Sequence, residues 1–139
     1  MYTLGIDIGS TTSKCVLLKD GKEIVGSSIV VAGTGTDGPS QALENVLNSA
    51  GVVREDISYT IATGYGRKIF QGADGEISEL SCHARGVHFV FPDVYTVIDI
   101  GGQDAKVLSL NDQGRMMNFA MNDKCAAGTG RFLEMLAGF

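Results

Sequence analysis

The chain has 139 residues, of which 44 % are apolar and 19 % are charged, which is typical of a soluble globular protein with enough material to bury a core. The net charge of −5 gives no electrostatic reason to expect nucleic-acid binding, and no apolar stretch is long enough to span a membrane. Because no signal-peptide pattern precedes the first predicted strand, we expect a cytoplasmic protein.

The first part of the chain is predicted to open with a three-stranded meander. Apolar strands are expected at 2–8 and 13–19, and Asp20-Gly21 is a strong hairpin signal that leads into a third strand ending near Ala32. Helical spacing of apolar residues predicts a helix over 40–51, with Pro39 at the first helical position. A short buried strand at 59–64 and a second helix over 76–90 follow.

The later part is predicted to begin with another meander. Strands are expected at 95–101, 105–110 and 115–121, with a turn at 111–114 and a helix that opens near Gly128. The order β-β-β-α-β-α, followed by the start of a second such unit, predicts a mixed α/β fold. A purely parallel doubly wound sheet does not suit this order. We predict one subdomain over 1–92 and the beginning of a second over 93–139.

Two segments of the chain repeat each other. "IDIGSTTSKCVLL" (6–18) and "IDIGGQDAKVLSL" (98–110) align without a gap. Asp7 matches Asp99, and Lys14 matches Lys106. Because the same lysine and the same second strand recur at the same offset, we interpret the segments as a duplication and not as two unrelated hairpins.

The repeated hairpins predict a site for a nucleotide and a metal ion. Glycine turns let backbone N–H groups approach an anion closely, and a buried aspartate at a strand end needs a cationic partner. Two facing hairpins would therefore clamp the phosphates of a nucleoside triphosphate, while Asp7 and Asp99 would bind Mg²⁺ through water. The candidate phosphate-binding residues are Gly9, Ser10, Thr11, Thr12, Ser13, Lys14, Gly101, Gly102, Gln103 and Lys106.

A second glycine-rich stretch competes for the nucleotide. "GTGTDG" (33–38) matches the dinucleotide fingerprint and lies between a predicted strand and a helix. The preceding strand, however, is joined to its neighbour by the Asp20-Gly21 hairpin, whereas a dinucleotide unit needs a parallel crossover. We therefore prefer a loop that precedes a helix. No G-x-x-x-x-G-K-S/T motif occurs, which excludes a P-loop.

The three cysteines form no C-x-x-C motif, which argues against a disulfide framework or a zinc site within one chain. Cys15 lies in an apolar strand and is predicted to be a core thiol. Cys125 lies in a loop before a helix start, where a thiol pKa is lowered, but spacing alone leaves open whether its role is functional or structural. Because adjacent residues on a helix diverge, we expect no joint metal site of Cys82 and His83.

Three other polar residues in the first part of the chain have structural or surface interpretations. His83 and His88 are expected to be structural or solvent-facing. The arginine of "TGYGR" (63–67) could contact phosphate or a neighbouring subdomain, or could simply belong to a surface turn.

Five segments together resemble a known family along essentially the whole chain: "LGIDIGSTTSKCVLL", "ATGYGR", "ISELSCHARG", "VIDIGGQDAKV" and "MNDKCAAGTGRFLE". They are similar to the activators (component A) of 2-hydroxyacyl-CoA dehydratases, including those of 2-hydroxyglutaryl-CoA dehydratase, and to the ATPase subunits of benzoyl-CoA reductase. The hairpins are common to the wider actin–Hsp70–sugar-kinase superfamily, whereas the last segment is more specific.

The resemblance implies an actin-like ATPase fold of ribonuclease-H-like subdomains that binds ATP or ADP with Mg²⁺. It implies a homodimer with one 4Fe–4S cluster held by two cysteines from each subunit, Cys125 among them. The implied function is ATP-driven transfer of one low-potential electron to the dehydratase, with ferredoxin or flavodoxin as electron donor. The second cluster cysteine and the adenosine-binding glycine motif would lie beyond Phe139, so that the chain resembles the N-terminal part of an activator.

Within this hypothesis, the hairpin positions suggest that Gln103 or Asp104 orients the attacking water. Two alternatives stay open. A small-molecule kinase of the same superfamily would use Asp99 or Asp104 as a base toward a substrate hydroxyl, and a non-enzymatic remnant would bind nothing tightly.

Overall fold

The computed structural model describes residues 1–101, 104–122 and 137, which belong to two compact units, Met1–Glu79 and Leu80–Phe139. The division lies after Glu79, not after Pro92 as the sequence predicts. The reason is packing, because Ala84 of the second helix is buried with Leu108 and Leu110 of the later strands. This helix therefore belongs with the second sheet.

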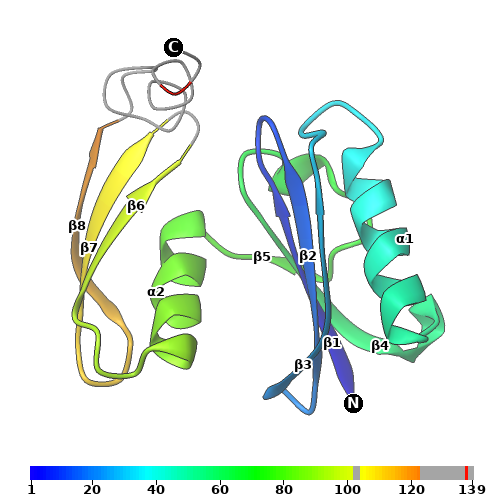
Figure 1. Cartoon of the computed structure of the whole chain (residues 1–139), viewed down its shortest axis with the longest axis horizontal. Coiled ribbons are helices and arrows are strands. Elements are labelled where there is room, and N and C mark those ends of the chain that lie inside the picture. The colour runs from blue at the N-terminus through cyan, green and yellow to red at the C-terminus, as the bar shows by residue number, and fades with distance from the viewer. Residues whose placement is uncertain (102–103, 123–136, 138–139) are drawn as a thin grey trace. The chain divides into compact units, whose positions relative to one another are not determined.

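The first unit is built on a mixed five-stranded sheet of order β3-β2-β1-β4-β5 (Figure 1). The first three strands form an antiparallel meander, while β4 runs parallel to both β1 and β5. This confirms the mixed α/β prediction, although the short β5 was not predicted. The strands are β1 (Tyr2–Ile8), β2 (Ser13–Lys19), β3 (Glu23–Val30), β4 (Ile57–Thr63) and β5 (Gly75–Glu76).

Local sequence explains the meander. Asp20 and Gly21 both have positive φ, 52° and 68°, as a type I′ hairpin turn requires. Successive side chains of a strand point to opposite faces. Leu4, Ile6 and Ile8 lie on the same face of β1, and this face is buried. The hydrophobic alternation and the turn chemistry therefore specify the same register.

Helix α1 (Gly38–Ala50) packs against this buried face (Figure 1). Pro39 occupies its first turn, as predicted, and the helix ends at Gly51, which adopts the left-handed conformation at φ 64°. Gly26 of β3 permits close packing, since a Cβ atom there would lie 3.1 Å from Val46 Cγ2. Two short 3₁₀ turns, η1 (Arg54–Asp56) and η2 (Arg67–Ile69), flank β4.

The second unit consists of helix α2 (Glu79–Val90) and the antiparallel sheet β6-β7-β8. Its strands are β6 (Thr96–Ile100), β7 (Ala105–Leu110) and β8 (Met116–Asn122), close to the predicted bounds. The helix predicted to open near Gly128 lies outside the described residues. Among the residues that are described, no helix is long and apolar enough to cross a membrane.

Candidate functional site

The duplicated hairpins place the same pair of charged side chains at the same register. Asp7 of β1 is paired with Lys14 of β2, and Asp99 of β6 is paired with Lys106 of β7. Lys14 Nζ lies 2.9 Å from Asp7 Oδ2, and Lys106 Nζ lies 3.5 Å from Asp99 Oδ2. The repeat seen in the sequence is therefore a repeat of side-chain pairing as well.

The turn is also closed in the same way in both hairpins. The N–H of Gly9 donates to the carbonyl oxygen of Thr12 at 2.9 Å, and the N–H of Gly101 donates to that of Asp104 at 2.8 Å. Asp104 thus takes the place that Thr12 has in the first hairpin. Gly102 and Gln103, predicted to bind phosphate, lie outside the described residues.

The tip of the first hairpin presents groups that could hold an anion. Ser10 and Thr11 are exposed, and within the described part of the chain their amide groups donate no backbone hydrogen bond. Unpaired N–H groups at a turn form a concave site for phosphate. Ser13, in contrast, is fully buried and its hydroxyl donates to the carbonyl of Ala32 at 2.7 Å. The structure therefore does not bring Ser13 together with the exposed hydroxyls.

Two glycine-containing turns, which carry Thr34 and Gly66, form hydrogen bonds to the first hairpin. The N–H groups of Thr34 and Gly66 donate to the carbonyls of Gly9 and Ile8, each at 2.8 Å. A Cβ atom at Gly64, which has φ 83°, would overlap Asp7 Oδ1. These approaches hold the Asp7 carboxylate and the turn that follows it in one position.

The 33–38 loop carries Thr34 and so helps to hold the first hairpin in place. It is not a dinucleotide fingerprint. β3 pairs antiparallel with β2, so the loop does not follow a parallel crossover strand. A Cβ atom at Gly33 would overlap the backbone of Ser10, and one at Gly38 would overlap the carbonyl of Ala32. The glycines are explained by close packing of backbone against backbone, which agrees with the preferred loop interpretation.

The second hairpin differs from the first in the environment of its lysine. Lys106 is only 3 % exposed and its Nζ lies 2.8 Å from Asp104 Oδ1, whereas the Lys14 side chain is 44 % exposed. A buried lysine cannot leave its carboxylates without a large loss of electrostatic energy. Of the two lysines predicted to bind phosphate, only Lys14 has the freedom to reach a ligand in solution.

Comparison with known proteins decides the family. The model of the BadF/BadG/BcrA/BcrD ATPase family matches residues 4–138. The chain belongs to this family.

Relatives within the ATPase family are similar over nearly the whole chain. A 2-hydroxyisocaproyl-CoA dehydratase activator from Clostridioides difficile is 61 % identical over 99 % of this chain and 52 % of its own length. An activator of lactoyl-CoA dehydratase from Anaerotignum propionicum is 60 % identical over 99 % of this chain and 53 % of its own length. The chain thus spans about half the length of the curated relatives it matches.

A solved structure supports the same assignment. The activator of the 2-hydroxyisocaproyl-CoA dehydratase from Clostridium difficile, with bound ADPNP, superposes with a TM-score of 0.94 at 60 % identity. The match covers 99 % of this chain and 52 % of that chain. The chain has the actin-like ATPase fold, as the resemblance in the sequence implied.

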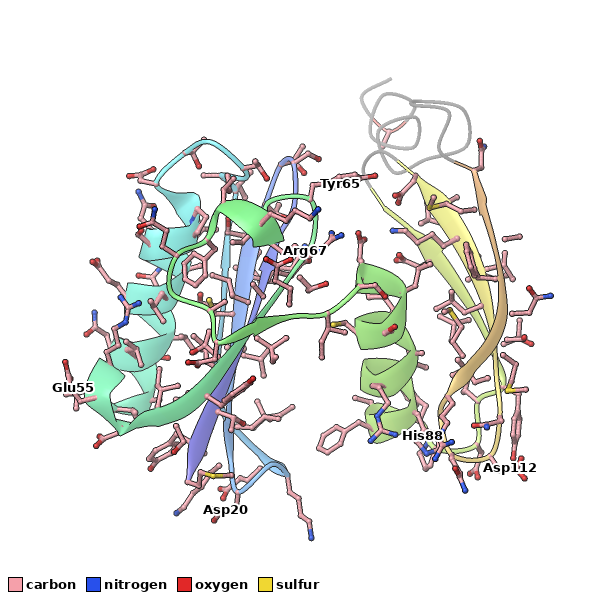
Figure 2. All side chains as sticks on the ribbon, turned by 180° about the vertical axis from the view of Figure 1, so that it is seen from behind. Asp20, Glu55, Tyr65, Arg67, His88 and Asp112 are labelled. Atoms are coloured by element: carbon pink, nitrogen blue, oxygen red, sulfur yellow. The ribbon has the colours of Figure 1, made fainter. Side chains whose placement is uncertain are left out.

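In this ATPase-family chain, Arg67 braces the glycine turn after β4 (Figure 2). Its Nη1 donates to the carbonyl of Gly64 at 2.9 Å, and its Nε lies 3.9 Å from Glu76 Oε2. The sequence leaves open whether this arginine contacts phosphate, contacts a neighbouring subdomain or belongs to a surface turn. The described contacts lie within the first unit and support the turn that packs on Asp7.

The two described cysteines, Cys15 and Cys82, differ in how deeply they are buried. Cys15 is 1 % exposed, which confirms the prediction of a core thiol, and this burial raises the pKa of the thiol to about 12. Cys82 lies half-buried in α2. Cys125, the candidate cluster ligand, lies outside the described residues.

Sequence reasoning missed His83. The expectation that it is structural or solvent-facing is not contradicted, but the sequence does not indicate its contact with Asp99. Its Nδ1 is buried 3.1 Å from Asp99 Oδ2, although the angles between the two groups do not meet those of a hydrogen bond. No sequence signal places a side chain of α2 beside a strand end, because the contact depends on how the helix packs on the sheet.

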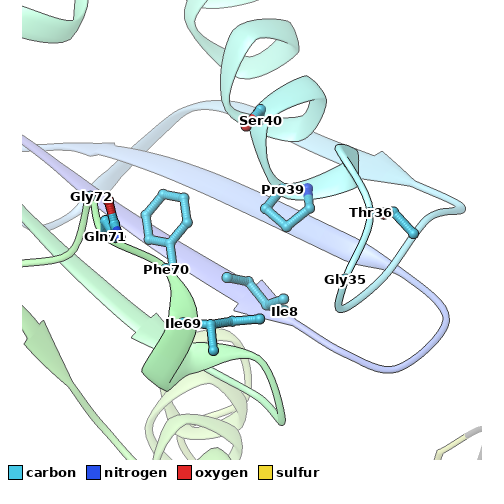
Figure 3. Close-up of a pocket in the computed structure, with 9 residues that line it drawn as sticks. All are labelled: Ile8, Gly35, Thr36, Pro39, Ser40, Ile69, Phe70, Gln71 and Gly72. Carbon is cyan, nitrogen blue, oxygen red and sulfur yellow. The ribbon is translucent and has the colours of Figure 1, made fainter.

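A pocket of about 330 Å³ lies between the start of α1 and η2, beside the end of β1 (Figure 3). Its lining includes Ile8, Pro39, Ile69 and Phe70. Because Asp7 and Ile8 are adjacent in a strand, their side chains point to opposite faces. The Asp7 side chain, part of the candidate nucleotide site, therefore points away from this pocket and is not among its lining residues.

Proposed function

We propose that this chain acts as the nucleotide-binding half of an ATP-dependent activator that transfers a low-potential electron to a 2-hydroxyacyl-CoA dehydratase. The observation that carries the proposal is the paired Asp–Lys hairpins within a chain 61 % identical to such an activator. The proposal extends to a homodimer and to ferredoxin or flavodoxin as the electron donor.

The first hairpin fits the phosphates and the metal of Mg·ATP. Ser10 and Thr11 offer exposed hydroxyl and amide donors, and Lys14 offers a mobile positive charge. Asp7 is partly exposed, and Mg²⁺ prefers carboxylate oxygens together with water and phosphate. We assign Asp7 and Asp99 to metal binding through water.

The burial of Asp104 bears on which of the two candidate residues orients the attacking water. Asp104 is 4 % exposed and its Oδ1 is held by Lys106, so it is badly placed to meet a water in the site. Between the two predicted candidates, this favours Gln103. Asp104 would instead hold the shape of the second hairpin.

Cys125 is proposed as one ligand of a 4Fe–4S cluster shared by two subunits. Such a cluster, when bound, supplies one electron at low potential, and it needs four thiolates. A two-fold axis would provide them from two cysteines of each subunit. Neither Cys15, which is buried in the first core, nor Cys82 matches the second ligand segment of the family.

Calorimetric titration of the 139-residue chain with Mg·ADP tests nucleotide binding. We expect saturable binding that Asp7→Asn weakens at least about tenfold, because tenfold corresponds to about 1.4 kcal/mol, less than a good charge-assisted contact. Glu55 is an exposed residue of η1 (Figure 2), and Glu55→Gln is the matched control. This variant should bind Mg·ADP as the parent does. A parent chain that takes up no Mg·ADP would contradict the proposal.

Iron analysis of the full-length dimeric activator tests the cluster assignment. We expect Cys125→Ala to lose most of the bound iron and the visible absorption after anaerobic reconstitution, because a thiolate ligand is removed. Cys82→Ala is the matched control and should keep both. An intact cluster in the Cys125→Ala dimer would show that this cysteine is not a ligand.

A further inference from the structure

The carboxylate of Asp99 is held from two elements of the second unit. Lys106 of β7 lies 3.5 Å from its Oδ2, and Nδ1 of His83 from α2 lies 3.1 Å from the same oxygen. Oδ1 has no hydrogen bond or ion pair within the described part of the chain. The two basic groups therefore engage one oxygen and leave the other available.

In the part of the chain that the structure describes, the only basic side chain recorded at the Asp7 carboxylate is Lys14. Asp7 is contacted closely by its lysine, at 2.9 Å, whereas Lys106 makes its shorter contact, 2.8 Å, with Asp104. The extra carboxylate draws the second lysine away from Asp99. At Asp99 Oδ2, Nδ1 of His83 is therefore closer, at 3.1 Å, than Nζ of Lys106, at 3.5 Å.

We infer that His83 is a positioning residue that fixes the Asp99 carboxylate from the side of α2. The inference rests on the proposed function, in which Asp99 binds Mg²⁺ through water. Nδ1 lies 3.1 Å from Oδ2, within the distance range of an N–H···O hydrogen bond, although the angles between the two groups do not meet those of one. Partners behind a ligating carboxylate fix its orientation, and their loss costs 10- to 100-fold in metal affinity.

The helix that carries His83 gives the restraint a rigid base. Ala84, the next residue, is 1 % exposed and packs with Leu108 and Leu110 of the sheet. α2 is therefore anchored to the sheet beside the residue that contacts Asp99. His88 on the same helix packs elsewhere, because a Cβ atom at Gly114 would overlap its ring.

A Mg²⁺ titration of ADP binding to the 139-residue chain tests the inference. We expect His83→Ala to raise the Mg²⁺ concentration for half-maximal binding about tenfold, while ADP affinity in EDTA stays at the parent value. His83→Gln retains a side-chain amide donor and should recover most of the effect. His88→Ala, with its melting temperature recorded, is the control on the same helix and should keep the parent Mg²⁺ dependence.

A second measurement needs no nucleotide. The side-chain carboxyl ¹³C signal of Asp99 should shift in His83→Ala and stay unchanged in His88→Ala. An unshifted signal, or a parent-like Mg²⁺ dependence in His83→Ala, overturns the inference. If the parent binds no Mg·ADP, the proposed function fails while the carboxyl signal still decides the contact, so the two failures are distinguishable.

Discussion

Lys106→Met is expected to lower the free energy of unfolding of the second unit by about 3–5 kcal/mol, because it leaves the carboxylate of Asp104 buried without its cation. Lys106 is 3 % exposed and the Asp104 side chain 6 % exposed, so water cannot replace the lost contact. Urea unfolding followed by circular dichroism measures the loss, and amide hydrogen exchange should locate it in β6 and β7.

The first hairpin supplies the matched control for this experiment. Lys14→Met breaks the equivalent pair with Asp7, but both side chains are partly exposed, 44 % and 27 %, and a pair of that kind contributes about 0–1 kcal/mol. The double variant Lys106→Met with Asp104→Leu should recover much of the loss, because no unpaired charge stays buried. Equal effects of Lys14→Met and Lys106→Met would contradict the difference in burial that separates the two hairpins.

Gly64→Ala should lower the free energy of unfolding of the first unit by about 2–4 kcal/mol, for two separate reasons. Its φ of 83° strains any residue with a Cβ atom, which costs about 1 kcal/mol or more. The added methyl group would also overlap Asp7 Oδ1 and approach the carbonyl oxygen of Ile8 to 2.5 Å, and overpacking costs about 1–3 kcal/mol. Urea unfolding of the variant measures the sum.

Two other glycines separate these contributions. Gly35 has nearly the same φ, 82°, but open space around it, so Gly35→Ala should show the backbone cost of about 1 kcal/mol alone. Gly5 of β1 also faces open space, without a positive φ, and Gly5→Ala should change the stability by less than about 0.5 kcal/mol. If Gly64→Ala is no worse than Gly35→Ala, the close approach to Asp7 does not constrain the site.

Much of the candidate site could be predicted from local sequence. Asp7 and Lys14 lie at equal distances from the tip of their hairpin, and so do Asp99 and Lys106, so that a tight turn alone brings each pair together. The antiparallel pairing of β2 with β3 followed from the Asp20-Gly21 turn. The duplication indicated that whatever the first hairpin does, the second repeats in outline.

The differences between the two hairpins could not be predicted in this way. Lys14 and Lys106 occupy equivalent positions in the repeat, yet one is mobile at the surface and the other is buried beside Asp104. Burial depends on the neighbours that the rest of the fold supplies. Likewise, the division after Glu79 follows from the packing of α2, which no local signal marked.

The sequence by itself determined the strands apart from the short β5, the hairpin registers, the pairing of Asp with Lys and the family, because period-two alternation and turn chemistry act between near neighbours in the chain. Only the tertiary structure decided which lysine can reach a ligand, that Gly64 packs against Asp7, and that His83 contacts Asp99. Those contacts join residues on separate elements, and their geometry is set by how a helix or a turn packs on a sheet.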